Sequence, residues 1–167
     1  TTLLRVIAGL ENLTSGSLVV NDLKLYSKSD FFKNEIVFLS KPLVFLQNKT
    51  VLENVKYAYY VRNKKNTSID FDSILNEFDL TDIKDKKVKT LSYYEKVKVA
   101  IARASLREFT FLLADELFDG FSESEVMQIV KYIKKIKFAT LILTSKLPLN
   151  IEGLEFKSIK LNAGYVA

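Results

Sequence analysis

The 167 residues include 25 lysines and arginines against 20 aspartates and glutamates, a net charge of +5, and 48% of the chain is hydrophobic. This balance is typical of one globular domain with a sizeable core, and no stretch approaches the roughly 18 uninterrupted apolar residues of a membrane span. Cysteine and histidine are absent, which excludes disulfides, thiolates and imidazole catalysis and leaves carboxylates, hydroxyls, lysines or a bound metal for any chemistry.

The chain opens inside a helical pattern that covers residues 1–10 and that Gly9 is suited to end. Because Thr1 is not a methionine and no helix-start signal precedes it, we expect the natural protein to have further residues upstream. A turn at Ser15 and Gly16 then leads to a short strand over residues 18–20. In the helical pattern over residues 1–10, the apolar residues that share one side are Leu3, Leu4, Ile7 and Ala8.

Three helices are predicted in the middle of the chain, after a buried strand over residues 36–39 and a loop over 40–49. Thr50 and Glu53 have capping-box spacing and predict a helix through residue 60. Residues 62–68 are polar and predict a surface connection. A second helix covers residues 71–78, and the capping box of Ser92 and Glu95 opens a third one to residue 106. The second helix is expected to turn Phe71, Ile74, Leu75 and Phe78 inward.

Strands and helices continue to alternate in the last third. Residues 109–114 and 140–144 predict buried strands, and residues 158–161 predict a last strand before a turn at 163–164. A helix capped by Ser122 and Glu125 lies between the first two strands. This alternation predicts an α/β domain with a mostly parallel sheet. The apolar face of that helix is formed by Val126, Ile129, Val130, Ile133 and Ile136.

The sharpest chemical signal is the run FLLADE over residues 111–116, an apolar strand that ends in Asp115 and Glu116. Ligands of α/β folds bind at the carboxyl edge of the sheet, where these two side chains are expected. In nucleotide hydrolases such a pair binds Mg²⁺ and orients the attacking water. An Asp-Glu pair alone can also mark the surface end of a strand. The spacing of other motifs is therefore needed to decide whether this pair belongs to a nucleotide site.

Several segments in matching order resemble the nucleotide-binding domain of an ABC transporter. The family signature LSGGQ followed by RVAIARA corresponds to LSYYE at residues 91–95 and VKVAIARA at 97–104. The other similar segments are TTLLRVIAGLE at 1–11, TSGSL at 14–18, TVLENV at 50–55 and FDGF at 118–121. The resemblance therefore covers essentially the whole chain.

This resemblance implies a P-loop NTPase-type sheet with an inserted helical subdomain over about residues 50–106. It also implies that residues 1–167 form one nucleotide-binding domain that lacks its N-terminal strands and phosphate loop. The implied cofactors are ATP and Mg²⁺. Thr1 and Asp115 would bind the metal, Glu116 would be the catalytic residue that polarises the water, and Thr1 and Thr2 would lie at the phosphates. Ser92 would face the nucleotide of a second subunit.

The implied partners are a transporter membrane domain and a second nucleotide-binding domain, in a homodimer or heterodimer at the cytoplasmic face of the cell membrane. The lysines are spread along the chain and interleaved with acidic residues, as on an ordinary solvated surface, which argues against nucleic acid as a partner.

The departures from the family pattern fall at phosphate-contacting positions. The glycine-rich loop and its lysine are not among residues 1–167, and the signature glycines and glutamine are replaced by Tyr93, Tyr94 and Glu95. The remaining changes are Leu39 for glutamine, Leu117 for proline, Ser122 for aspartate and Ser145 for the switch histidine.

These changes favour a degenerate cassette with weak or no ATP hydrolysis that works beside a competent partner. Because Asp115 and Glu116 are retained, a working ATPase is the competing interpretation. The alternatives are a non-catalytic regulatory or scaffold cassette, and a soluble ABC-type ATPase that acts on nucleic acid or the ribosome.

Overall fold

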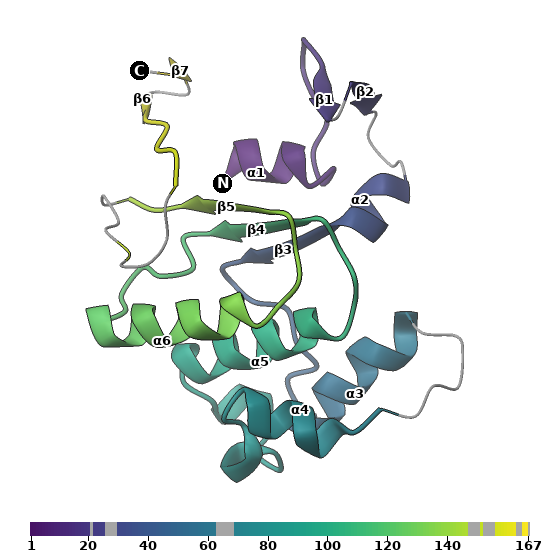
Figure 1. Cartoon of the computed structure of the whole chain (residues 1–167), viewed down its shortest axis with the longest axis vertical. Coiled ribbons are helices and arrows are strands. Elements are labelled where there is room, and N and C mark those ends of the chain that lie inside the picture. Colours follow the sequence, from purple (N-terminus) through teal and green to yellow (C-terminus); the bar gives the residue numbers. More distant parts are fainter. Residues whose placement is uncertain are drawn as a thin grey trace.

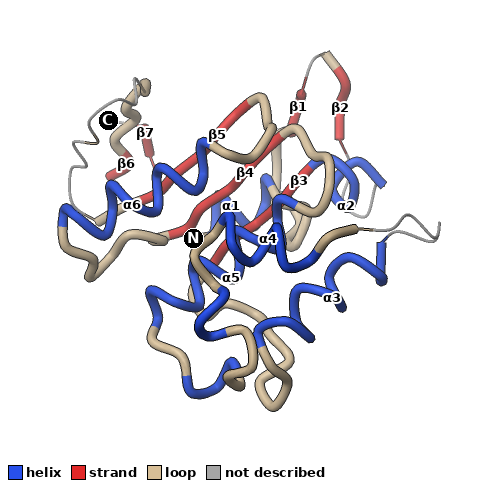
Figure 2. Tube along the Cα trace, turned by 60° about the horizontal axis from the view of Figure 1, so that its bottom comes forward, coloured by secondary structure: helices blue, strands red, loops and turns tan. Residues whose placement is uncertain are grey.

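A three-stranded parallel sheet forms the centre of the protein (Figure 1). The computed structural model describes residues 1–20, 22–25, 30–62, 69–146, 151, 156–162 and 165–166. The strands are β3 (Ile36–Ser40), β4 (Phe111–Asp115) and β5 (Thr140–Thr144), in the order β3-β4-β5. Figure 2 shows them side by side, with the antiparallel pair β1 (Leu18–Val20) and β2 (Leu23–Leu25) apart from the sheet. The predicted α/β class with a mostly parallel sheet is confirmed.

Helices cover both faces of this sheet because the strand side chains alternate between two hydrophobic clusters. On one face, Ile36 and Leu113 pack with Leu4 of α1 (Thr2–Ile7) and Phe32 of α2 (Asp30–Glu35). On the other, Val37 and the neighbouring strand residues pack against α5 (Tyr93–Ser105) and α6 (Glu123–Lys134). The central strand β4 is buried on both sides, which explains its continuous apolar run.

Gly9 follows α1 in a conformation that a side chain would not tolerate. Its φ is +69°, and a Cβ added there would collide with the ring of Phe32. Glycine is therefore required at this position for α1 and α2 to pack together on the sheet.

Below the sheet in Figure 1 lie α6, α5, α3 (Val51–Arg62) and α4 (Phe71–Glu77). Short 3₁₀ turns, η1 (Thr81–Ile83) and η2 (Val88–Thr90), connect α4 to α5. All three predicted capping boxes are confirmed. The Glu53 N–H donates to Thr50 Oγ1 at 3.1 Å, and the Thr50 N–H donates to Glu53 Oε2 at 2.7 Å. Equivalent pairs open α5 at Ser92 and α6 at Ser122.

Two expectations in the last third were wrong. The strand β5 is not buried as predicted: its residues are exposed or half-buried, because the hydrophobic clusters on the two faces of the sheet cover Leu141, Ile142 and Leu143 only in part. Residues 158–160 form no strand; β6 (Leu161–Asn162) and β7 (Tyr165–Val166) pair with each other and with no other strand in the described part of the chain. The predicted turn at 163–164 and nearly all of the polar connection at 62–68 lie outside the described residues.

Candidate functional site

The candidate site lies where β4 and β5 end together. The register places Asp115 opposite Thr144, the last residues of the two strands. The Thr144 hydroxyl donates to Asp115 Oδ1 at 2.7 Å, and the Glu116 N–H reaches Thr144 Oγ1 at 3.1 Å and its carbonyl oxygen at 3.2 Å. These bonds fix the backbone just after β4, where Glu116 adopts a left-handed φ of +50°. Such a conformation is uncommon for a non-glycine residue and concentrates at functional sites.

The carboxyl group of Asp115 is held in its ionised form. Burial alone would raise its pKa, but the hydrogen bonds from the side chains of Thr144 and Thr1 bring the pKa below its ordinary value. A buried, ionised carboxylate beside a threonine hydroxyl suits Mg²⁺, which prefers oxygen ligands and commonly takes one or two carboxylates together with substrate phosphates. No cluster of three or more acidic residues suited to a metal occurs among the described residues, and such a Mg²⁺ site does not need one.

Glu116 faces an ammonium group. Lys146 Nζ lies 2.8 Å from Glu116 Oε2 and 3.9 Å from Asp119 Oδ2. The hydrogen bond to Glu116 raises the pKa of Lys146. Ser145 Oγ lies 3.5 Å from Asp119 Oδ1, so the segment after β5 reaches the segment after β4 through two side chains.

The structure brings together three of the residues that the sequence singled out. The nitrogen of Thr1 lies 3.5 Å from Asp115 Oδ1, and Glu116 is adjacent in the chain. Thr2 is the first residue of α1 and is exposed. The hydroxyl of Ser92 is engaged in the N-terminal cap of α5, where it donates to Glu95 Oε2 at 2.9 Å.

Sequence reasoning missed Thr144 and Lys146 as members of the site. The signal that could have found them is the parallel sheet itself. The residues that end one strand, or directly follow it, lie beside those of its neighbour, and Thr144 and Lys146 end and follow a predicted strand as Asp115 and Glu116 do.

The two tyrosines after Ser92 are half-buried and pack against the edge of the hydrophobic core. Their ring centroids lie 5.4 Å (Tyr93) and 5.5 Å (Tyr94) from that of Phe121, and the ammonium of Lys41 lies 4.4 Å from the Tyr93 ring. Burial, together with the charge of Asp119, raises the pKa of Tyr93. The start of α5 is thus filled by an aromatic cluster where glycines would leave the backbone accessible.

Replacing Tyr93 by phenylalanine should leave the free energy of unfolding unchanged or raise it by about 1 kcal/mol. The Tyr93 hydroxyl is buried and has no hydrogen-bond partner among the described residues, so the ring can be kept and an unsatisfied group removed. Urea unfolding of both variants measures the difference. Tyr132→Phe is the matched control, because that hydroxyl bonds to Asp79 and Gln128 and its loss should cost about 1 kcal/mol. Equal destabilisation by both changes would contradict the packing described for Tyr93.

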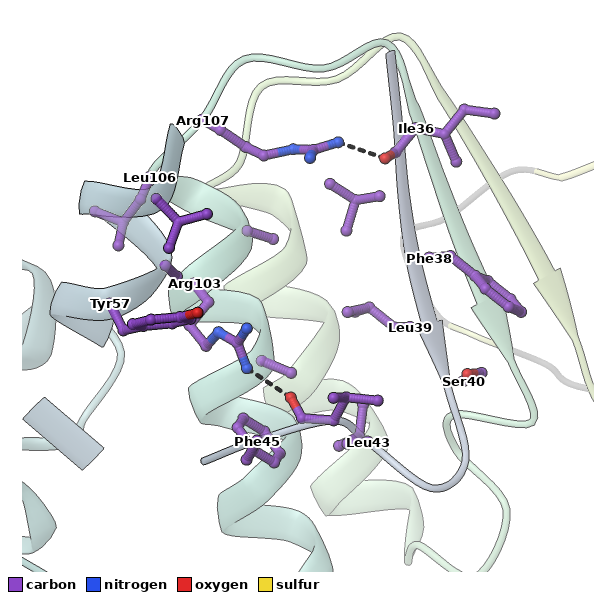
Figure 3. Close-up of a pocket in the computed structure, with 16 residues that line it drawn as sticks. Ile36, Phe38, Leu39, Ser40, Leu43, Phe45, Tyr57, Arg103, Leu106 and Arg107 are labelled. Atoms are coloured by element: carbon purple, nitrogen blue, oxygen red, sulfur yellow. Dashed lines mark hydrogen bonds between the residues drawn. The ribbon is translucent and has the colours of Figure 1, made fainter. Parts of the chain in front are cut away.

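A cleft of about 320 Å³ opens between β3, the loop that follows it, α3 and α5 (Figure 3). Arg103 Nη1 donates to the carbonyl oxygen of Val44 at 2.7 Å, and Arg107 donates to that of Ile36. Exposed apolar side chains line the cleft, among them Val44, which is 82% exposed, and Tyr57, which is 52% exposed.

The loop at this cleft is held from α3. The side-chain amide of Asn54, which is buried, donates to the carbonyl oxygen of Leu46 at 3.0 Å and accepts from its N–H at 2.9 Å. The exposed apolar surface is therefore carried by a fixed loop. Across the described residues, no helix has the length and apolar character needed to cross a bilayer.

Comparison with known proteins points to one family. The family model described as "ABC transporter" matches residues 1–119. The chain is 30% identical over 172 residues to the molybdenum import ATP-binding protein of Saccharophagus degradans, covering 99% of this chain and 48% of that protein. It is 33% identical over 144 residues to the methionine import ATP-binding protein of Histophilus somni, covering 81% and 41% of the two chains.

A third relative is the sn-glycerol-3-phosphate import ATP-binding protein of Psychromonas ingrahamii, 30% identical over 140 residues, with 81% of this chain and 37% of that protein covered. The chain thus spans less than half the length of these three curated relatives.

Solved structures agree with the fold. A putative ABC transporter ATP-binding protein from Pyrococcus furiosus superposes with a TM-score of 0.68 at 18% identity, over 89% of this chain and 73% of that one. The ATP-binding cassette MJ0796, a dimer in a post-hydrolysis state with ADP and Pi bound, gives a TM-score of 0.67 at 21% identity, over 87% and 68% of the two chains.

Proposed function

Because this chain belongs to the ABC transporter family of ATP-binding proteins, we propose that it couples ATP binding and hydrolysis to transport through a membrane partner. The observation that carries this proposal is the pair Asp115 and Glu116 at the carboxyl edge of the sheet, fixed there by Thr144. The relatives compared above are named as import ATP-binding proteins, which favours a transporter over an ATPase that acts on nucleic acid or the ribosome.

In this proposal Thr1 and Asp115 hold Mg²⁺, and Thr1 and Thr2 lie at the phosphates. The metal, when bound, would offset the charge of the β- and γ-phosphates. Glu116 polarises and orients the attacking water as general base. Thr144 positions the carboxylate of Asp115 directly and fixes the backbone N–H of Glu116, so that this part of the site is formed before nucleotide binds.

The phosphate loop is not among residues 1–167, so the proposal places it upstream of Thr1 in the full-length protein. The unpaired edge of β5 supports a further strand there, since within the described part of the chain β4 is its only neighbour in the sheet. Residues 1–167 would then be one nucleotide-binding domain without its N-terminal strands, and residues 50–106 its helical subdomain.

We propose that two such domains pair head to tail, with Ser92 facing the nucleotide of the other subunit. The hydroxyl of Ser92 is engaged by Glu95, whose pKa is lowered by the bonds from Ser92 despite the opposing effect of burial. An ionised Glu95 and the packed rings of Tyr93 and Tyr94 disfavour phosphate contact. The cassette is therefore degenerate on its signature side and competent on its carboxylate side.

The membrane partner would dock at the cleft beside β3, at the cytoplasmic face of the membrane. Val44 and Tyr57 offer apolar contact there, and Arg103, which also lines the cleft, offers a charged one. Leu39 of β3 lines the same cleft, so this strand connects the docking surface to the sheet edge that carries the site.

Asp115→Asn tests the proposed site in the full-length protein. This change keeps the shape of the side chain and removes the charge, so we expect the Mg²⁺-dependent part of the ATP affinity to fall by about tenfold or more. Isothermal titration with ATP in Mg²⁺ and in EDTA measures it. Asp82→Asn, an exposed aspartate on η1, is the control and should change nothing. An unchanged Mg²⁺ dependence in Asp115→Asn would refute the site.

A further inference from the structure

Lys146 extends from the end of β5 over the carboxylates that end β4. Its ammonium lies 2.8 Å from Glu116 Oε2 and 3.9 Å from Asp119 Oδ2, yet its side chain is 71% exposed. An exposed ion pair of this kind contributes little to stability. The ammonium is therefore held at the site by Glu116 while part of its surface stays open to a ligand.

Three acidic side chains lie around Lys146 at this edge of the sheet. Asp115, Glu116 and Asp119 place three carboxylates where the proposed function puts a triphosphate. One divalent ion would only partly offset the repulsion between these groups. A lysine ammonium carries three N–H donors, which can bind a carboxylate and a phosphate oxygen together.

The distances place that phosphate within reach. A water held by Glu116 would lie at hydrogen-bond distance from its carboxylate and about 3–3.5 Å from the phosphorus it attacks. Lys146 Nζ is already at hydrogen-bond distance from the same carboxylate. Its flexible stem needs only a small movement to bring the ammonium to a γ-phosphate oxygen.

We propose that Lys146 binds the γ-phosphate of the bound nucleotide and so makes the site prefer ATP to ADP, an inference that rests on the proposed function. Ser145, which stands at the position of the family's switch histidine, has no charge for this contact, and the lysine that follows it supplies one. ADP lacks the γ-phosphate, so the contact distinguishes the two nucleotides.

The test is the affinity of the full-length protein for Mg²⁺-bound adenylyl imidodiphosphate and for Mg-ADP, by isothermal titration. Lys146→Ala should weaken the triphosphate analogue by about tenfold and leave ADP unchanged. Lys146→Arg should restore most of the preference. Lys131→Ala, which removes an exposed lysine from α6, is the charge-matched control and should alter neither affinity.

Three results would overturn the proposal. An equal loss for both nucleotides would mean that Lys146 acts only on general charge or folding. A gain in triphosphate affinity in Lys146→Ala would mean that Lys146 blocks Glu116 and does not bind the phosphate. Wild-type protein that binds neither nucleotide would overturn the proposed function and this inference with it, whereas the first two results leave the proposed function standing.

Discussion

Restoring the family signature, with Tyr93→Gly, Tyr94→Gly and Glu95→Gln together, is expected to raise the steady-state ATPase rate of the full-length homodimer by about 100-fold or more. In a head-to-tail pair each nucleotide lies between the carboxylates of one subunit and the signature of the other. A homodimer of the wild-type chain repeats the obstructed signature at both sites. Glycines would let the backbone approach the γ-phosphate, and glutamine would remove a negative charge beside it.

The control keeps the bulk and removes only the hydroxyls. Tyr93→Phe with Tyr94→Phe preserves the packing on Phe121 and should leave the ATPase rate at the wild-type level. The glycines cost helix propensity and packing at the start of α5, so thermal melting must show that the restored protein is folded at the assay temperature. A folded restored protein with no gain in rate would contradict the assignment of the defect to the signature.

Residues 1–167 alone should bind Mg-ATP at least about 100-fold more weakly than the full-length protein. The backbone N–H groups and the lysine of a phosphate loop supply much of the phosphate contact in this class of site, and they are not among these residues. Two charge-assisted hydrogen bonds, at roughly 1.5–3 kcal/mol each, account for a difference of this size.

Parallel isothermal titrations of the two proteins give the ratio. Mg-ADP serves as a second ligand, because a loop that holds the β-phosphate should strengthen its binding too. Micromolar affinity for Mg-ATP in the 167-residue chain would contradict the proposal that the loop lies upstream.

The elements that the sequence predicted best are helices that begin with a capping box and a strand with a continuous apolar run. Ser92 with Glu95 and Ser122 with Glu125 marked the starts of α5 and α6 correctly, because a capping box is a local interaction. The strand β4 was found from its apolar run, since burial on both faces leaves no polar alternation.

The errors arose where structure depends on partners or on very short segments. The six residues of α2 and the three of β2 are too short to show a period, and neither was predicted. The apolar run of β5 predicted burial, but burial of a strand depends on what covers its two faces, and the two hydrophobic clusters cover those of β5 only in part. Residues 158–160 likewise find no partner strand.

The candidate site divides in the same way. Asp115 and Glu116 were identified from an adjacent pair at the end of a strand, which is a local pattern. Thr144 and Lys146 contribute through contacts across 28 to 30 positions of the chain, so only the pairing of the two strands marks them as members of the site. The tyrosines of the signature were expected to obstruct a phosphate, and their packing on Phe121 depends on a segment that folds back onto α5.

The steady-state ATPase rate of the restored full-length homodimer, with Glu116 intact and with Glu116→Gln, shows directly whether Glu116 is the catalytic base. The glutamine keeps the size of the side chain and removes the base, so we expect a loss of about 100-fold or more in turnover with ATP binding retained. Turnover that is indifferent to Glu116→Gln, or absent in every form of a folded protein that binds ATP, would contradict it. Either result would mean that the carboxylates at the end of β4 do not catalyse ATP hydrolysis.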